Sequence, residues 1–205
     1  KTAVLQGGAA DLLIVTAMDA AAPGLWLVEA GAAERRPWRL ADGSIAAEIA
    51  LNGAPATRLG DAVLLPPVLA LARLGAAAEM VGLMQRLFDT TLAHVKTRQQ
   101  FGQPLGAFQV IQHRMTDAYV ALEQARSQVI RAALAPPVDF ARAAAGARAH
   151  VGERAIEVAH TAVQMHGGMG ITDELLVGHA LKRIRVLTQW LGDGTAALDD
   201  YRKVA

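Results

Sequence analysis

The spacing of hydrophobic positions changes about a third of the way along the chain. Up to about residue 60 the apolar positions form short runs, such as Asp11 to Ala17 and Gly24 to Glu29, which turn-forming residues separate. From about Val68 onward, apolar residues recur every three to four positions, which is the spacing of one helix face. The pattern therefore predicts a small β segment followed by a longer helical segment.

The β segment is predicted to be incomplete by itself. Ala3 to Leu5 forms a further short run, and Ile45 to Leu51 fits either a strand or a helix, although Asn52-Gly53 directly after it favours a hairpin. So few short strands would leave exposed edges and a thin core. We therefore expect residues 1–62 to be part of a β-domain that further residues or a partner chain complete.

The helical segment, residues 63–205, is predicted to be an antiparallel four-helix bundle. Clusters of glycine and proline divide it into long periodic helices with short connections. The four long helices are expected at about 68–97, 107–134, 140–165 and 173–190, with a short fifth helix from about Thr195. The predicted fold class is therefore mainly α, with a C-terminal helical-bundle domain preceded by part of a small β-domain.

Composition supports the helices and argues against a nucleic-acid partner. Hydrophobic residues make up 53% of the chain, many of them alanine, and aromatic residues only 4%, which favours closely packed helices over a β-sandwich. The 20 basic and 19 acidic residues nearly cancel, leaving a formal net charge of +1. No basic stripe remains to bind a polyanion, so nucleic-acid binding is not expected.

Several other kinds of site are not expected either. The chain has no cysteine, which excludes disulfides and thiolate chemistry in it and is compatible with a cytoplasmic location. No paired histidine and carboxylate spacing indicates a metal site. The longest apolar stretch, around Val63 to Leu74, includes Pro66, Pro67 and Arg73 and is too short to span a bilayer, so we expect no membrane partner.

Three segments carry residues that could do chemistry. Arg98 to Leu105 places a cation, amides and an aromatic ring after a predicted helix, Gln164 to Gly170 ends another helix in a glycine-rich turn, and Leu191 to Thr195 sets a carboxylate between two glycines. Glycine-rich turns let backbone N–H groups approach an anion, and arginine offers a bidentate fork for phosphate. Each segment alone also fits a structural role, as a helix C-cap, a solvated helix-end charge or a turn.

Taken together and in this order, the three segments resemble the helical domain of acyl-CoA dehydrogenases. RQQFGQPLGAFQVIQH, QMHGGMGIT and LGDGT are similar to the family patterns Arg-x-x-Phe-Gly, Gln-x-x-Gly-Gly-x-Gly and Glu-Gly-Thr. Gly82 to Gln85 lies at the family's distance upstream of the first pattern. The resemblance covers essentially the whole chain, since the residues from Lys1 onward are similar to the later strands of the family's β-domain.

The resemblance implies an FAD site that is shared between subunits. In the family, FAD lies between the β-domain of one subunit and the helical domains of two. The resemblance therefore also implies a homo-oligomer, either a dimer or a tetramer, or a hetero-oligomer with a paralogue. The residues that match FAD contacts are Arg98, Gln100, Phe101 and Gln109, then Gln164, Gly167 and Gly168 of the glycine turn, and Thr195.

The family's reaction, part of fatty acid metabolism, removes two hydrogens from an acyl-CoA thioester and gives a trans-2-enoyl-CoA, with electron-transfer flavoprotein as the expected acceptor. A carboxylate takes the α-proton while FAD accepts the β-hydrogen as hydride. Asp193 stands where the family has the glutamate of Glu-Gly-Thr and is the candidate base, and Arg73 matches an arginine at the substrate end. The alternative glutamate position is Ala72, and Ala3 and Leu5 replace a flavin-contacting Trp and Thr.

Two other hypotheses stay open beside an active acyl-CoA dehydrogenase. The aspartate in place of glutamate, together with Ala3 and Leu5, also fits a catalytically silent FAD-binding subunit that pairs with a glutamate-bearing paralogue. The third hypothesis is a non-catalytic helical interaction protein that holds no cofactor. Flavin binding separates the third hypothesis from the first two, and activity of the chain alone separates the first from the second.

Overall fold

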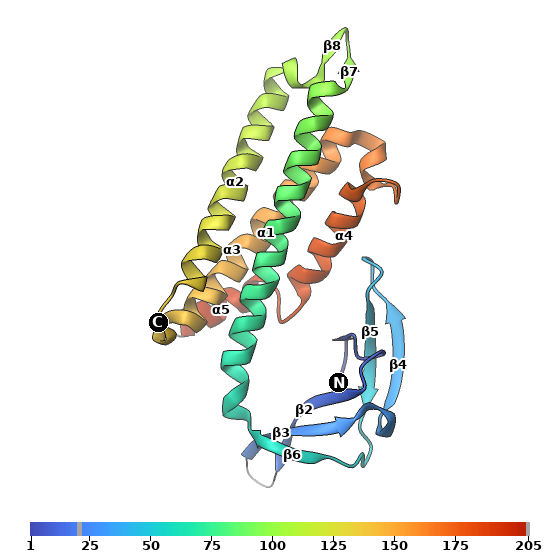
Figure 1. The fold of residues 1–205 in the computed structure, drawn as a ribbon, viewed down its shortest axis with the longest axis vertical. Coiled ribbons are helices and arrows are strands. Elements are labelled where there is room, and N and C mark those ends of the chain that lie inside the picture. The colour runs from blue at the N-terminus through green and yellow to red at the C-terminus, as the bar shows by residue number, and fades with distance from the viewer. Residues whose placement is uncertain (20–21, 204–205) are drawn as a thin grey trace. The chain divides into compact units, whose positions relative to one another are not determined.

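The computed structural model describes residues 1–19 and 22–203. The chain divides into two compact units, which meet between Val68 and Leu69 inside the first long helix. Strands form the first unit, and long helices form the second (Figure 1).

The first unit is built from two small antiparallel sheets. One sheet has the order β1 (Val4–Leu5), β5 (Ile45–Ala50) and β4 (Glu34–Arg39). The other has the order β2 (Leu12–Asp19), β3 (Ala22–Glu29) and β6 (Thr57–Asp61). The ambiguous stretch that begins at Ile45 is thus a strand, and it is the central strand of its sheet.

The apolar pattern did not predict strands β4 and β6. Both have mostly exposed side chains, so they lack the alternation of apolar and polar residues that marks a half-buried strand. β4 also contains Pro37, which is tolerated because β4 pairs only with β5 among the described strands and is an edge strand. A small core forms where Leu13, Val15 and Val28 pack with Ile49.

The second unit is a helical bundle, as predicted. Its helices are α1 (Leu65–Thr97), α2 (Gln109–Ala133), α3 (Pro137–His166), α4 (Leu176–Gln189) and α5 (Gly194–Lys203). A short hairpin of β7 (Gln99–Gln100) and β8 (Gln103–Pro104) joins α1 to α2, and the turn η4 (Gly167–Ile171) follows α3. In Figure 1, α1 and α2 run in opposite directions on either side of this hairpin.

The bundle packs around α3, which contacts α2, α4 and α5. Alanines fill much of the buried surface of α3, and Ala144, Ala155 and Ala159 have no exposed surface at all. Larger side chains from the other helices, among them Leu122 of α2 and Ile184 of α4, complete the same core. Small residues on one helix allow its neighbours to approach closely, so the alanine content seen in the sequence becomes tight helix packing.

Helix α1 is the described segment that could cross a membrane by length and composition alone. With the short turn before it, it covers Ala62–Thr97, 36 residues with a mean hydropathy of 1.5 in its most apolar window. The apolar stretch around Val63 to Leu74 is thus the beginning of a longer helix, because Pro66 and Pro67 lie in the first helical turn, where proline is tolerated. Of the residues in that window, 28% are buried, and Met84 and Leu87 of α1 are fully buried in the bundle.

The packing predicts a clear contrast between two leucine substitutions. Leu122 is 1% exposed, whereas Leu134, at the end of the same helix, is 79% exposed. Leu122→Ala is expected to lower the free energy of unfolding by about 2–5 kcal/mol, through lost burial and the cavity left behind. Leu134→Ala should change it by no more than about 0.5 kcal/mol. Denaturant titration of the helical circular dichroism signal measures both, and equal losses would contradict this packing.

Candidate functional site

The predicted site residues fall into two groups near opposite ends of α3. One group gathers where α1 ends, α2 begins and α3 ends, and includes Arg98 and Gln164. The other group surrounds the turn between α4 and α5, which carries Asp193 and contacts Arg148 in the first half of α3. Arg148 and Gln164 lie roughly 16 positions apart, which is about 24 Å along a helix.

The first group is arranged by the hairpin after α1. The backbone N–H of Leu105 donates to the carbonyl of Arg98 at 2.8 Å, which closes the hairpin loop next to the helix end. Phe101 occupies the tip with a φ of +53° and is 92% exposed. Its ring meets Phe108 edge-on, at a centroid distance of 6.2 Å. The hairpin therefore presents an aromatic ring and Arg98 at the surface together.

The polar side chains of this group are available to a ligand. The Arg98 guanidinium is exposed and makes no hydrogen bond or ion pair within residues 1–19 and 22–203. The side-chain amides of Gln109 and Gln164 are also exposed and have no partner in the same part of the chain. The side chain of Gln100, by contrast, has a partner, because its Nε2 donates to the carbonyl of Gln99 at 2.8 Å. A free guanidinium fork with neighbouring amide groups suits a phosphate.

The glycine turn after α3 lies beside this surface. Gly167 has a φ of +60° and a ψ of −144°, a conformation that only glycine adopts readily. Its N–H donates to the carbonyl of Gln164, and the chain then turns into η4, which includes Gly168. The rings of His94 and His166 stack at a centroid distance of 4.2 Å, which joins the end of α1 to the end of α3. Arg98 and the glycine turn therefore belong to one surface, and its donors fit the diphosphate of FAD.

The second group centres on the turn between α4 and α5. Asp193 is the N-cap of α5, where its Oδ1 accepts a hydrogen bond from the N–H of Ala196 at 2.9 Å. Its Oδ2 has no partner among the described residues. Leu191 and Gly192 just before it have positive φ angles of 63° and 92°. Thr195 lies exposed in the first turn of α5.

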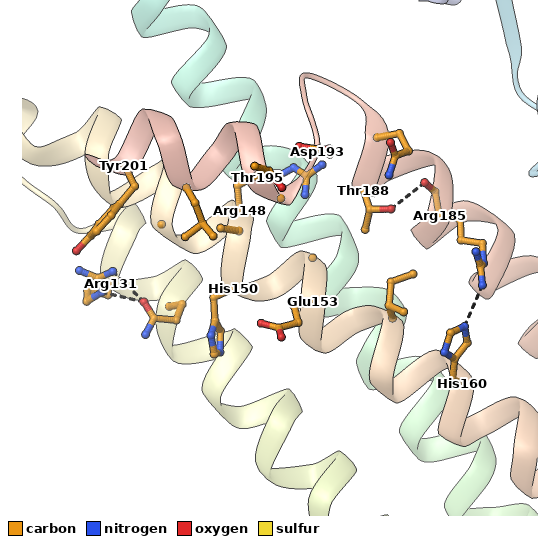
Figure 2. Close-up of a pocket in the computed structure, with 18 residues that line it drawn as sticks. Arg131, Arg148, His150, Glu153, His160, Arg185, Thr188, Asp193, Thr195 and Tyr201 are labelled. Atoms are coloured by element: carbon orange, nitrogen blue, oxygen red, sulfur yellow. Dashed lines mark hydrogen bonds between the residues drawn. The ribbon is translucent and has the colours of Figure 1, made fainter. Parts of the chain in front are cut away.

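A cavity of about 1100 Å³ opens beside this turn. Asp193 and Thr195 line it together with residues of α3 and α4, and Figure 2 shows these side chains around Arg148. Charges of both signs face it, and one contact in it joins Arg185 Nη2 to His160 Nε2 at 3.0 Å. None of the first group of residues lines this cavity.

Arg148 is a residue of this site that the sequence did not indicate. It is 1% exposed, and its Nη2 donates to the carbonyls of Leu187, Trp190 and Gly192. Burial and the nearby Arg73 lower the pKa of Arg148, while Asp193 acts in the opposite direction. The one signal in the sequence was an arginine within an alanine-rich, buried helix face.

The comparison with known proteins decides the family. A family model described as "Acyl-CoA dehydrogenase, C-terminal domain" matches residues 64–202. The chain belongs to the acyl-CoA dehydrogenase family. FAD-dependent dehydrogenation of an acyl-CoA is the general reaction of this family of oxidoreductases.

Among acyl-CoA dehydrogenases, this chain is similar to "Acyl-CoA dehydrogenase IpdE2" of Mycolicibacterium smegmatis. The two are 41% identical over 116 residues, which are 57% of this chain and 36% of that protein. The structure is also similar to a "Tcur3481-Tcur3483 steroid ACAD G363A variant", with a TM-score of 0.89, 28% identity and coverage of 100% of this chain and 57% of that chain.

A third similar structure is the "ChsE4-ChsE5 complex from Mycobacterium tuberculosis", with a TM-score of 0.90 and 28% identity. The match covers 99% of this chain and 57% of that chain. The chain thus spans about a third of the matched curated acyl-CoA dehydrogenase and somewhat over half of each solved chain.

The structure also places Arg73 and three positions at which the chain departs from the acyl-CoA dehydrogenase pattern. Arg73, expected at the substrate end, forms an ion pair from Nη2 to Oδ2 of Asp200 on α5 at 2.6 Å, and its side chain is 18% exposed. Ala72, the alternative place for a glutamate, is half-buried and supplies no carboxylate. In the first unit, Ala3 has a φ of +50° and Leu5 pairs with Ala46 of β5.

The stacked histidines predict a pH-dependent stability. Burial is the largest cause that lowers the pKa of His94 below its ordinary value of 6.5, and His166 and Arg98 add to it. Below pH 6.5 the unfolded chain therefore takes up this proton before the folded chain does, so the contribution of His94 to stability falls as the pH drops. His94→Gln should make the melting temperature less sensitive to pH between about 7.5 and 5.

The exposed His113 on α2 provides a matched control for this experiment. His113→Gln should keep the pH dependence of the wild-type protein. Identical pH profiles for the wild-type and His94→Gln proteins would contradict the effect ascribed to burial of His94.

Proposed function

We propose that this chain is part of an acyl-CoA dehydrogenase that builds each FAD site from two chains, with Asp193 as the base. One chain supplies the surface for the FAD diphosphate and adenosine end. The other chain supplies Asp193, next to the flavin ring and the acyl-CoA. The surface for the diphosphate end consists of Arg98, Gln100, Phe101, Gln109, Gln164, Gly167 and Gly168.

The separation of the two groups is the observation that carries this proposal. Residues near Arg98 and residues near Asp193 lie toward opposite ends of α3, and the cavity beside Asp193 includes none of the former. All seven residues of the diphosphate surface are exposed, and Arg98 has no partner in the described part of the chain. A second chain that brings its own Asp193 turn to this surface would give one FAD both sets of contacts.

The proposed chemistry assigns one step to the carboxylate. Bound FAD supplies the acceptor for the β-hydrogen and its electron pair. Asp193 takes the α-proton of the thioester, and its Oδ2 is the available oxygen because Oδ1 accepts the N–H of Ala196. Thr195, two residues further along the chain, would contact the cofactor. Electron-transfer flavoprotein is the acceptor we propose for the reduced flavin.

A silent subunit in a heteromeric acyl-CoA dehydrogenase is the second candidate. Aspartate is shorter than glutamate by one methylene, and a misplacement of about 1 Å can lower a rate about a hundredfold. Asp193 also already serves as a helix cap, and Ala72 supplies no replacement base. The similarity to the ChsE4–ChsE5 complex favours a paired arrangement, and the similar "steroid ACAD" favours a bulky acyl group as substrate.

Substitutions of Asp193 distinguish the base from the cap. Asn is as good an N-cap as Asp but accepts no proton. In the full-length protein, Asp193→Asn should therefore keep the melting temperature and lower the rate of flavin reduction by acyl-CoA about 10²–10⁴-fold. Asp193→Ala should lose the same activity and in addition about 1 kcal/mol of stability. Stopped-flow flavin absorbance without oxygen gives the rate, and thermal unfolding gives the stability.

Asp199→Asn is the matched control, because Asp199 is an exposed carboxylate on the same helix, 3.6 Å from Arg202. It should change neither quantity. If wild-type and Asp193→Asn proteins reduce flavin at the same rate, Asp193 is not the base. If the wild-type protein reduces flavin only after a paralogue is added, the silent subunit is the correct alternative.

Flavin affinity tests the diphosphate surface. Arg98→Ala in the full-length protein should raise the Kd for FAD about 10–100-fold, since a charged hydrogen bond contributes about 1.5–3 kcal/mol. The stability of the FAD-free protein should stay unchanged, because Arg98 has no partner within the described residues. Arg114→Ala, which removes an exposed arginine of α2, is the control. An unchanged Kd for Arg98→Ala would contradict the assignment.

A further inference from the structure

Arg148 lies where an arginine is least expected. It is on the inner side of α3, among Ala144, Ala147 and Val151, and only 1% of its surface is exposed. Taking a guanidinium out of water is unfavourable unless it finds hydrogen-bond acceptors. The acceptors therefore show which segment of the structure Arg148 holds in place.

Within residues 1–19 and 22–203, all acceptors of Arg148 belong to the segment that leads to Asp193. Nη2 donates to the carbonyl of Leu187 in the last turn of α4, to that of Trp190 at 3.2 Å and to that of Gly192 at 3.5 Å. The last carbonyls of a helix have no partner in their own helix and carry partial negative charge. Arg148 thus caps the end of α4 from a neighbouring helix.

The segment held in this way is a strained turn. Leu191 has a φ of +63°, in a region that residues other than glycine avoid, and Gly192 follows with a φ of +92°. Asp193 comes next and caps α5 through the N–H of Ala196. Arg148 therefore holds the end of α4 and the turn, and Asp193 holds the start of α5.

Gly152 provides the space for this arrangement. A Cβ atom at Gly152, one turn along α3, would lie 3.0 Å from Nη1 of Arg148. Nη1 and Nε have no hydrogen-bond partner within the described residues, so Nη2 makes every contact that fixes the guanidinium. A methyl group at position 152 would push the guanidinium without removing its charge.

We propose that Arg148 is a positioning residue, which holds the turn between α4 and α5 so that Asp193 reaches its place in the active site. Without it, the turn relaxes, and Asp193 and the first turn of α5 move together. The catalytic consequence rests on the proposed function of Asp193, whereas the effect on the turn does not. The experiment therefore measures both separately.

The first measurement is hydrogen exchange of the full-length protein, followed by mass spectrometry. Arg148→Met should raise exchange at least severalfold in residues 190–203 and leave α1 and α2 at wild-type protection. Gly152→Ala should give the same local pattern while retaining the arginine. Arg148→Lys, which keeps a charged donor on a shorter side chain, should lie between Met and the wild type. Arg154→Met is the control, because Arg154 pairs with Glu157 on the exposed side of α3.

The second measurement is flavin reduction by acyl-CoA. Misplacement of the base predicts that Arg148→Met and Gly152→Ala lower kcat about tenfold to a hundredfold with little change in KM, and that Arg148→Lys recovers part of the loss. If the wild-type protein shows no turnover, the proposed function fails, and hydrogen exchange alone decides on Arg148.

Two results would overturn the proposal. One is unchanged exchange in residues 190–203 for both Arg148→Met and Gly152→Ala. The other is a uniform rise in exchange over all helices for both variants, which would make Arg148 a general stabiliser of the bundle. If Arg148→Met does not fold, Gly152→Ala and Arg148→Lys give the same comparison.

Discussion

The close packing of the alanine-rich helix α3 is the constraint on which the rest of the helical unit depends. Ala144, Ala155 and Ala159 have no exposed surface, so neighbouring helices lie directly against the α3 backbone. α3 therefore separates the glycine turn that follows its C-terminal end from the turn between α4 and α5, which contacts its first half. The glycine turn and Arg98 surface lie at its C-terminal end, and Arg148 with the Asp193 turn lies in its first half. Because the Arg98 group and the Asp193 group are separated in one chain, we favour a site built from two chains.

The helices could be predicted from the sequence because glycine and proline mark their ends and apolar spacing marks their faces. Strands β4 and β6 could not, because their exposed side chains carry no alternating pattern. The residues of the proposed diphosphate surface were visible in the sequence as motifs, but their distance from Asp193 was not. The contact between Arg148 and Trp190 and the ion pair between Arg73 and Asp200 each join positions far apart in the chain. The local spacing of apolar residues contains no information on such contacts.

Asp193 has two tasks in this account, and they make different demands. As an N-cap its carboxylate must turn back toward Ala196, whereas as a base it must extend toward the substrate. Because the two oxygens of one carboxylate are separate acceptors, Oδ1 can cap while Oδ2 takes the proton. The arrangement leaves little freedom in the backbone of the turn, which is why Arg148 and the conformation at Gly192 matter beyond their contribution to stability.

The shared site can be tested directly with mixed oligomers of two variants, assayed at an FAD concentration that saturates the wild-type protein but leaves Arg98→Ala sites largely without FAD. Arg98→Ala and Asp193→Asn subunits of the full-length protein, carrying different tags, are co-expressed, and the mixed oligomer is purified through both tags. If each FAD site uses Arg98 of one chain and Asp193 of the other, a mixed dimer contains one intact site. Rapid flavin reduction by acyl-CoA should then return with about half the wild-type amplitude. Reduction as slow as in either variant alone would contradict a site built from two chains.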